Sequence, residues 1–272
     1  MSSSPLPRWD DMTADAVRAL VKRDPVAILP LAATEQHGPH LPLSTDLHIG
    51  MGLLAAAFQG LPQDLPARVL PPVTFGASLE HLRFPGTVSI SSGELQATIE
   101  SVGASLAAAG VRRLVLANSH GGNTAAMEAA GLRLRERRGL LVVKVSYPRF
   151  PRPTDVNFPE TEWTHGLHGG AVETSMMLHL RPDLVGDPPP ASPPSSLGEE
   201  LGSHLTWLAP EGPASFSWLA GDLHPSGVVG RPELASPEAG RLLVEHYGRI
   251  LAEVVEDAHR FPLERLHEPQ GR

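Results

Sequence analysis

Short apolar runs alternate with amphipathic stretches along most of the 272 residues, and this alternation predicts an α/β protein. Three runs, at residues 26–33, 112–117 and 140–145, have the length and the continuous apolar character of fully buried strands. The further predicted elements are helices at 47–59, from Ser92 to about Ala109 with Gly110 as the stop, from Asn123 or Thr124 to about Arg138 and at 237–259, and an extended segment at 67–74.

Repeats of strand, helix and strand predict a mostly parallel central sheet with helices on both faces. We expect a single domain over residues 1–272, because the chain after the proline-rich segment 187–196 is too short for a core of its own. That segment is typical of a stiff excursion over the surface. The apolar stripe of the helix at 237–259 should pack on the sheet.

Composition and charge exclude several classes of function. A net charge of −8, from 22 Lys and Arg against 30 Asp and Glu, does not favour a surface for nucleic acid or for an anionic membrane. Because the chain has no cysteine, a metal ion would be bound through nitrogen and oxygen atoms. No apolar run approaches the roughly 20 residues of a membrane-spanning helix, and residues 1–5 lack the features of a signal peptide. We therefore expect a cytoplasmic protein with a small substrate.

The loop after the first strand carries two carboxylates and an imidazole. Glu35 and His37 are two residues apart, so they project to the same side if the chain stays extended. Asp46 follows a stretch whose glycine and prolines forbid a helix. The three side chains could form half of a metal site. As an alternative, the loop is a polar turn in which Asp46 or Thr45 caps a helix that begins near Leu47.

A second histidine-bearing loop follows the strand at 112–117 and contains His120-Gly121-Gly122. The carboxyl ends of parallel strands meet at one edge of a sheet, so His120 should reach the same edge as Glu35. The two glycines would let the backbone approach a ligand closely. They could also cradle a phosphate at a helix N-terminus, although the loop has neither a Gly-x-Gly-x-x-Gly spacing nor a following lysine.

The third cluster is His168-Gly169-Gly170 followed by Glu173, which would lie in the first turns of a helix. A buried carboxylate needs a partner to offset its desolvation, and a metal ion would supply one. As an alternative, Glu173 favours the helix N-terminus electrostatically, and the two methionines that follow belong to the core.

The three motifs are Glu35-x-His37-Gly38-x-His40-Leu41-Pro42 with Asp46, then Asn118-x-His120-Gly121-Gly122-Asn123, then His168-Gly169-Gly170-x-x-Glu173-Thr174-Ser175. Together they resemble the creatininase family of metal-dependent amidohydrolases. The resemblance extends from about Val26 through the segment 226–230 to the terminal helix. It implies a three-layer α/β/α fold and a site for two divalent metal ions, commonly zinc, manganese or iron.

The resemblance also implies the role of each ligand. On the matching positions, Glu35 and His120 would bind one ion, His37 would bind the other, and Asp46 would bridge both. A carboxylate-bridged metal pair lowers the pKa of a bound water and presents hydroxide to an amide carbonyl. The chemistry implied is therefore hydrolysis of a C–N bond.

The chain departs from creatininase itself at one position. Creatininase carries a glutamate two residues after the histidine of the second motif, where this chain has Gly122. Relatives with the Gly-Gly-Asn form complete the second ion with the glutamate of the third motif, which is Glu173 here. This departure puts creatinine hydrolysis in doubt.

A proton is needed for the leaving nitrogen, and His168 is the candidate shuttle because an imidazole titrates near neutral pH. A plain structural histidine is the alternative. His40 is better suited to orienting a ligand than to binding an ion. The long loop at 75–87 is typical of a binding loop or of a subunit contact. The predicted substrate-binding or ligand-orienting residues are His40, Ser78, Glu80, His81, Asn118, Gly121, Gly122 and Asn123.

The sequence therefore predicts a hydrolase with two metal ions, for which His168 and Glu173 are the candidate catalytic residues. Its substrate would be a cyclic amide, a formamide or a peptide-like molecule. The alternatives are a biosynthetic peptidase or deformylase of the same family, a C–C hydrolase acting on a cyclic ketone, and a metal- or small-molecule-binding protein without turnover. No nucleic acid or membrane partner is expected. The resemblance implies a homo-oligomer, often a hexamer.

Overall fold

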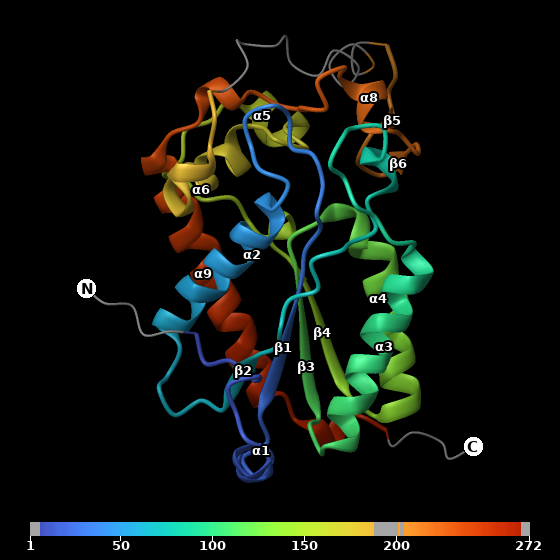
Figure 1. Ribbon diagram of the computed structural model, residues 1–272, viewed down its shortest axis with the longest axis vertical. Coiled ribbons are helices and arrows are strands. Elements are labelled where there is room, and N and C mark those ends of the chain that lie inside the picture. The colour runs from blue at the N-terminus through green and yellow to red at the C-terminus, as the bar shows by residue number, and fades with distance from the viewer. Residues whose placement is uncertain (1–5, 188–200, 202–203, 268–272) are drawn as a thin grey trace.

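The centre of the molecule is a parallel four-stranded sheet, shown in Figure 1. The structure is a computed structural model and describes residues 6–187, 201 and 204–267. Every residue of the two central strands is buried, which accounts for their continuous apolar sequences. In the order β2-β1-β3-β4, the strands are Ala67–Val69, Val26–Leu31, Arg113–Asn118 and Leu141–Ser146.

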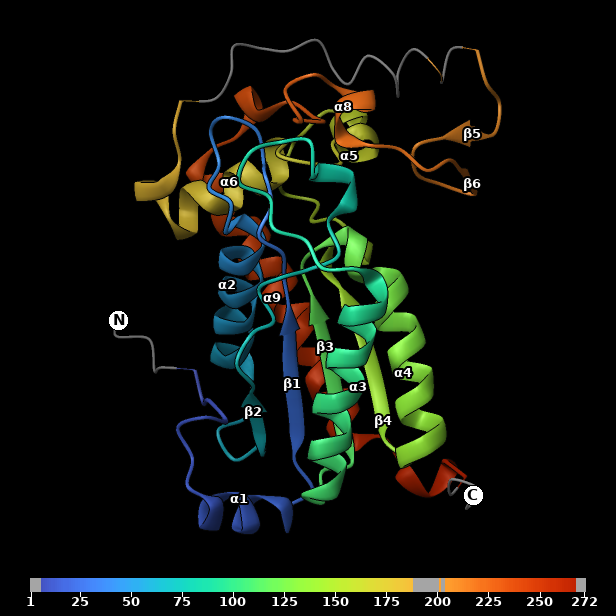
Figure 2. The same ribbon diagram turned by 45° about the vertical axis from the view of Figure 1, so that its right-hand side comes forward.

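Helices cover both faces of the sheet, as Figures 1 and 2 show, so the predicted three-layer α/β/α arrangement is confirmed. Val26 and Ile28 of β1 pack with the helices of one face, whereas the alternate residues Ala27 and Leu29 pack with those of the other. The helices of the first face are α2 (Thr45–Gly60), α6 (Ala171–Leu180) and α9 (Pro237–Arg260), and those of the second are α3 (Ser92–Ala108) and α4 (Thr124–Arg138).

Most of the predicted helices and strands agree with the structure to within two residues. The predicted stop at Gly110 is confirmed, because its φ of +94° lies in the left-handed region that favours glycine. The extended segment at 67–74 is wrong in length. Strand β2 ends at Val69, because two prolines follow Leu70 and only Val73 returns to pair with Leu31.

Several short elements were not predicted from the pattern of apolar residues. They are α1 (Ala14–Val21), α5 (Glu160–His165), α8 (Ala220–Leu223), β5 (Leu208–Ala209), β6 (Ala214–Ser215) and 3₁₀ turns at Leu79–His81, Gly121–Asn123, Tyr147–Arg149, Pro182–Leu184, Pro232–Leu234 and Leu263–Arg265.

Most of the proline-rich segment 187–196 lies outside the described residues. Among the described residues, no helix is long and apolar enough to cross a membrane.

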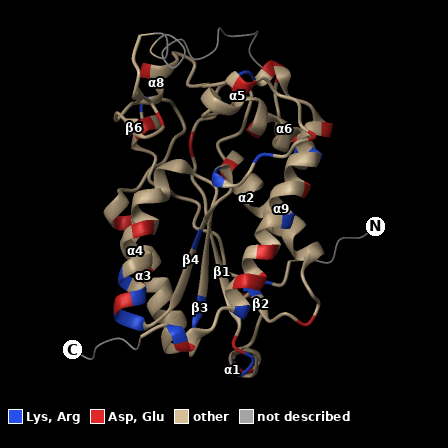
Figure 3. Cartoon of the chain, turned by 180° about the vertical axis from the view of Figure 1, so that it is seen from behind, with Lys and Arg blue, Asp and Glu red and all other residues tan. Residues whose placement is uncertain are grey.

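An ion pair fixes the amino-terminal end of the sheet, where Figure 3 shows basic positions at the start of β3. The carboxylate of Asp24 accepts hydrogen bonds from Arg112 (2.8 Å and 3.1 Å) and from Arg113. The guanidinium of Arg113 also donates to the carbonyls of Ala258 (2.8 Å) and Phe261 (3.0 Å) at the end of α9. Burial would raise the pKa of Asp24, but the two guanidinium groups outweigh it and hold the pKa below its ordinary value.

Replacing Asp24 should therefore destabilise the fold in a pH-dependent way. Asn tolerates the left-handed φ of +54° at this position, so Asp24→Asn removes the charge without adding backbone strain. We expect the free energy of unfolding at pH 7 to fall by about 1–3 kcal/mol. The wild-type advantage should be present above about pH 4 and be lost as the pH falls through the lowered pKa of Asp24. Denaturant unfolding at several pH values measures the difference.

The matched control is Asp183→Asn, because Asp183 forms an exposed ion pair with Arg181. Its effect should be much smaller than that of Asp24→Asn, because solvent screens an exposed ion pair. Equal effects of the two substitutions would contradict a stabilising role for the partly buried pair.

Candidate metal centre

Two loops that leave the carboxyl ends of β1 and β3 meet at one edge of the sheet. The strands are neighbours in parallel register, with Leu31 opposite Asn118, so the loops begin side by side. Glu35 and His37 follow the first strand and His120 follows the second. The structure therefore brings these side chains together at the edge of the sheet, as the sequence predicted.

The loop between β1 and α2 folds back on itself and brings Asp46 to His37. The fold-back depends on Gly38, whose φ of +75° favours glycine. The backbone N–H of Glu35 donates to the carbonyl of Leu43 (3.1 Å), which closes the loop. Asp46 then lies in the first turn of α2, with its carboxylate directed at the ring of His37.

The alternative in which Asp46 or Thr45 caps this helix is wrong. The N-cap is Ser44, and α2 begins at Thr45. Asp46 is only 1% exposed, and its Oδ1 lies 3.3 Å from Nε2 of His37. The carboxylate thus points into the cluster of ligand-type side chains.

Five side chains from three parts of the chain form this cluster. Nδ1 of His120 lies 3.2 Å from Oε1 of Glu35 and 3.5 Å from Oδ2 of Asp46. Nε2 of His37 lies 3.3 Å from Oδ1 of Asp46 and 3.9 Å from Oε1 of Glu173. Three groups with the spacing of metal ligands result: Glu35, Asp46 and His120; His37, Asp46 and Glu173; and Glu35, His37 and His168. Asp46 belongs to the first two of these groups.

The donor atoms of the cluster fit a bound cation. Among the described residues, both carboxylate oxygens of Glu35, Nε2 of His37 and Oδ2 of Asp46 are buried without a hydrogen-bond partner. Buried polar atoms without partners are costly and uncommon. Divalent ions bound by carboxylate oxygens and imidazole nitrogens would satisfy all four atoms.

The pKa values of the side chains in the cluster indicate that its carboxylates require nearby positive charge. Burial would lower the pKa of His37 and His120, but the surrounding carboxylates raise the pKa of each imidazole to about 10. Burial, with Glu35 nearby, raises the pKa of Asp46 to about 6. Burial would raise the pKa of Glu35 too, but the histidines, His120 foremost, hold it below its ordinary range. Protons or metal ions on the imidazoles can meet this demand.

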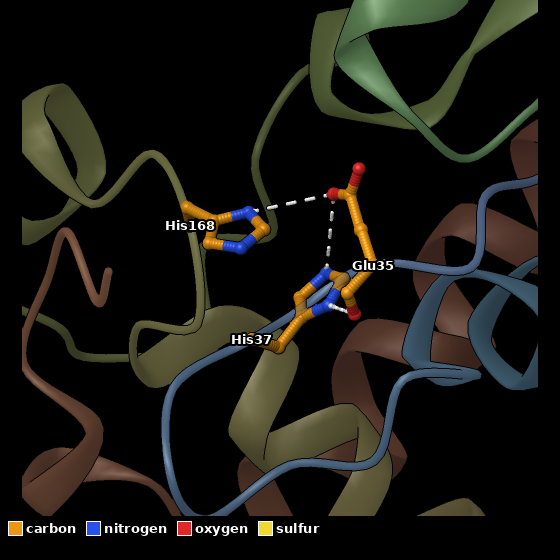
Figure 4. Close-up of side chains that lie close together, drawn as sticks. All are labelled: Glu35, His37 and His168. Atoms are coloured by element: carbon orange, nitrogen blue, oxygen red, sulfur yellow. Dashed lines mark hydrogen bonds and ion pairs between the residues drawn. The ribbon is translucent and has the colours of Figure 1, made fainter. Parts of the chain in front are cut away.

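His168 faces the cluster from the loop before α6, as Figure 4 shows. Its Nε2–H donates to the carbonyl of Gln36 (2.6 Å), so the lone pair of Nδ1 is directed at Oε1 of Glu35, 3.8 Å away. The ring stacks between those of His37 and His81, with centroids 4.1 Å apart on both sides. Burial, together with His37, lowers the pKa of His168 to about 4. The imidazole is therefore neutral and can accept a proton at Nδ1.

The other side of the His120 ring contacts the loop at 75–87. Nε2 lies 3.0 Å from the carbonyl oxygen of Ala77 and 3.2 Å from Oγ of Ser78. Donation by Nε2–H to the carbonyl leaves the Nδ1 lone pair for the cluster. A Cβ on Gly122 would overlap the oxygen of Ala77 and lie 2.7 Å from Oε1 of Glu80. Gly122 thus permits the approach of another protein loop.

The remaining residues of the second motif shape its loop. Asn118 donates from Nδ2 to the carbonyl of His120 (2.6 Å), and Asn123 accepts the backbone N–H of Ala77 at Oδ1 (3.0 Å). Both asparagines are buried. The position of Gly121 is open, with no atom within 4 Å of an added Cβ. These asparagines hold the polypeptide around His120 in place.

Two of the predicted histidines have partners that the motifs did not indicate. Nε2 of His40 lies 2.8 Å from Oγ1 of Thr174, next to Glu173 in sequence. Nδ1 of His81 lies 2.8 Å from Nε2 of Gln36. Both contacts orient rings beside the cluster.

Gln36 could not be identified from spacing, because in an extended chain it points away from its neighbours Glu35 and His37. The turn at Gly38 and the approach of the loop at 75–87 decide its contacts. Glu80 and Glu173 are partly exposed, at 20% and 15% of their side-chain surface, so these two side chains reach solvent beside the buried ligands.

Known proteins resemble this chain over most of its length. The family model described as "Creatininase: Creatinine amidohydrolase" matches residues 10–255. A mycofactocin precursor peptide peptidase of Mycolicibacterium smegmatis is 40% identical over 171 residues, which are 62% of this chain and 63% of the relative. A mycofactocin precursor peptide peptidase of Mycobacterium tuberculosis is 33% identical over 261 residues, covering 93% of this chain and 90% of the relative.

The fold gives the same assignment. A crystal structure of creatinine amidohydrolase (creatininase) superimposes with a TM-score of 0.75 at 29% identity, covering 95% of this chain and 100% of the other. The family model also spans all three motifs whose side chains meet at the sheet edge. The chain belongs to the creatininase family of amidohydrolases.

Proposed function

We propose that the chain is a hydrolase with two divalent metal ions that cleaves a C–N bond in a peptide-like substrate. The observation that carries this proposal is the position of Asp46 in two groups of buried nitrogen and oxygen donors. A shared carboxylate is the feature that allows two ions to act on one substrate.

Each proposed ion has three protein ligands. Glu35, Asp46 and His120 would hold one ion, and His37, Asp46 and Glu173 would hold the other. Donor sets of carboxylate and imidazole accept several first-row metals, so we propose zinc, manganese or iron. When bound, such a pair supplies an activated water as nucleophile and polarises the carbonyl oxygen of the amide.

His168 is proposed as the residue that moves a proton. Because its Nε2–H is held by the carbonyl of Gln36, only Nδ1 is free to exchange a proton in the site. A neutral imidazole can take a proton there and return it to the leaving nitrogen. Glu173 accepts the backbone N–H of Gly169 at Oε2 (2.6 Å), which leaves Oε1 directed at His37 for its role as a ligand.

Two observations favour a peptide-like substrate over creatinine. The relatives named mycofactocin precursor peptide peptidase align with as much as 93% of this chain. In addition, the resemblance of the second motif places Gly122 where creatininase has a glutamate, and the loop carrying Ala77 and Glu80 fills the space beside Gly122. A glutamate at this position would displace that loop. The substrate side is proposed to include Ser78, Glu80 and His81.

The first test is metal content together with hydrolysis. Protein purified without chelators should contain about two divalent ions per chain, because each of the two groups that contain Asp46 would provide the ligands for one ion. Elemental analysis measures the content. Chelation should abolish hydrolysis of short peptides, and adding zinc, manganese or iron should restore it. Creatinine, a lactam, a formamide and a cyclic ketone complete the substrate panel.

Less than one ion per chain, or hydrolysis that persists in the chelated protein, would contradict the proposed chemistry. Preference for the formamide or the lactam would keep the metal centre but reassign the substrate class. Cleavage of the cyclic ketone alone would indicate a C–C hydrolase.

Removing one proposed ligand should remove one ion. Glu173→Gln keeps the shape of the side chain but weakens it as a ligand, whereas Glu35, Asp46 and His120 stay intact. We expect the metal content to fall to about one ion per chain and hydrolysis to fall by about 10–100-fold or more. Elemental analysis and initial rates measure the two effects.

The control is Glu128→Gln, because Glu128 is 46% exposed and pairs with Lys144. It should change neither property. Full metal content in Glu173→Gln would show that Glu173 is not a ligand.

The two adjacent glycines of the second motif should respond differently to an added methyl group. In Gly122→Ala, the Cβ would collide with the carbonyl of Ala77 and lie 2.6 Å from Nε2 of His120. We expect a loss of stability of about 1–3 kcal/mol and a loss of hydrolysis. Gly121→Ala, which meets no atom within 4 Å, should keep the stability of the wild type. Thermal unfolding and initial rates provide the measurements, and equal behaviour of the two variants would contradict the steric explanation.

A further inference from the structure

A buried carboxylate outside the proposed ligand set, that of Glu162, connects two distant parts of the chain. Glu162 lies in α5 and is 2% exposed. Its Oε1 accepts the backbone N–H of Ala171 (2.7 Å), and its Oε2 accepts that of Arg231 (2.8 Å). Figure 2 shows α5 and α6 together at the end of the molecule beyond the carboxyl ends of the strands. The carboxylate thus joins the start of α6 to a segment 60 residues later.

Three glycines make room for this carboxylate. A Cβ added to Gly166 or to Gly170 would lie 2.5 Å from Oε1 of Glu162, and one added to Gly230 would lie 3.0 Å away. Gly170 has an extended backbone (φ −81°, ψ −162°) that any residue can adopt. Its requirement for glycine is therefore steric and comes from Glu162.

The two segments that Glu162 joins include residues of the candidate centre. The backbone N–H of His168 donates to the carbonyl of Val229 (3.0 Å), and the N–H of Val229 donates back to the carbonyl of His168 (2.7 Å). Next along the chain, the N–H of Gly169 donates to Oε2 of Glu173 (2.6 Å). A shift of this short segment would therefore move the His168 ring and the Glu173 carboxylate together.

We propose that Glu162 is a positioning residue for the metal centre. By accepting the N–H groups of Ala171 and Arg231, it fixes the segment from His168 to Glu173 against residues 229–231. This inference rests on the proposed function, because it assigns Glu162 to the ion that His37, Asp46 and Glu173 would hold. The ion of Glu35, Asp46 and His120 depends on other loops and should be independent of Glu162.

The position requires a carboxylate rather than an amide. Each of the two oxygens accepts one backbone N–H, so both acceptors are used. Glutamine has the same shape but only one acceptor oxygen, and its NH₂ group would face an N–H donor. Glu162→Gln therefore loses at least one of the two connections with little change in volume.

Titration of the metal-free protein with Zn²⁺ tests the proposal. In Glu162→Gln, the affinity for one of the two Zn²⁺ ions should fall by about 10–100-fold, and the affinity for the other should stay within about twofold of the wild type. Amide hydrogen exchange at Ala171 and Arg231 should accelerate by about tenfold or more. The matched control is Glu160→Gln in the same helix, because Glu160 is 72% exposed and should affect neither measurement.

A second variant tests the steric part from the opposite side. Gly170→Ala places a methyl group against Oε1 of Glu162 and should reproduce the selective weakening of one Zn²⁺ ion. Gly221→Ala is its control, because an added Cβ at Gly221 meets no atom within 4 Å.

Three outcomes would overturn the inference. The first is wild-type Zn²⁺ affinities and exchange rates in Glu162→Gln, and the second is equal weakening of both ions. The third is global unfolding of Glu162→Gln and Gly170→Ala, because the proposed role is local.

If the wild-type protein itself binds no Zn²⁺, the proposed function fails. Faster exchange confined to residues 169–171 and 229–231 of Glu162→Gln would then still support the local role.

Discussion

The convergence of negative charge at the edge of the sheet is the constraint on which the site depends. Glu35 and Asp46 are almost fully buried, and Glu173 belongs with His37 and Asp46 to one of the candidate ligand groups. A buried carboxylate needs positive charge or hydrogen-bond donors to offset its desolvation, and both oxygens of Glu35 and Oδ2 of Asp46 have no hydrogen-bond partner among the described residues. Within the described part of the chain, these three carboxylates form ion pairs with histidines and with no Lys or Arg side chain. His37 and His120 must therefore carry protons or hold cations, and the pKa of about 10 for each of these imidazoles reflects the field of the carboxylates.

The fold supports this arrangement by placing two ligands on helices and three on loops that leave buried strands. The parallel register of β1 and β3 sets the starting points of the two loops that carry Glu35, His37 and His120. Both strands are buried along their whole length, which holds these starting points in place. Asp46 is held in the first turn of α2, and Glu173 in the first turn of α6. These two helices pack on the same face with α9. A metal site on strand ends and helix starts is more precisely placed than one on loops alone.

The sequence predicts what topology and periodicity determine. The apolar runs identify β1 and β3, and the rule that parallel strands end at one edge brings His120 to Glu35 across more than eighty residues. The length of β2 could not be predicted in this way, because it depends on the residue at which the chain leaves the sheet. The chain leaves after Val69, just before Leu70 and two prolines. Side-chain direction beyond a strand end was equally inaccessible. The Asp46 carboxylate turns inward because the loop before α2 folds back at Gly38. The residues at the start of the helix do not by themselves indicate this turn.

The glycines of the motifs show why the site extends beyond its ligands. From sequence, paired glycines after a histidine indicate close approach of a ligand to the backbone. In the structure, Gly122 instead admits the carbonyl of Ala77, which binds the far nitrogen of the His120 ring. Gly170 admits the carboxylate of Glu162, which binds the backbone next to the His168 loop. In both motifs the missing side chain makes room for a protein acceptor. The imidazole and carboxylate ligands are thus oriented by protein groups that do not themselves bind an ion. A description of the site that names only its ligands therefore omits the residues that hold the ligands in place.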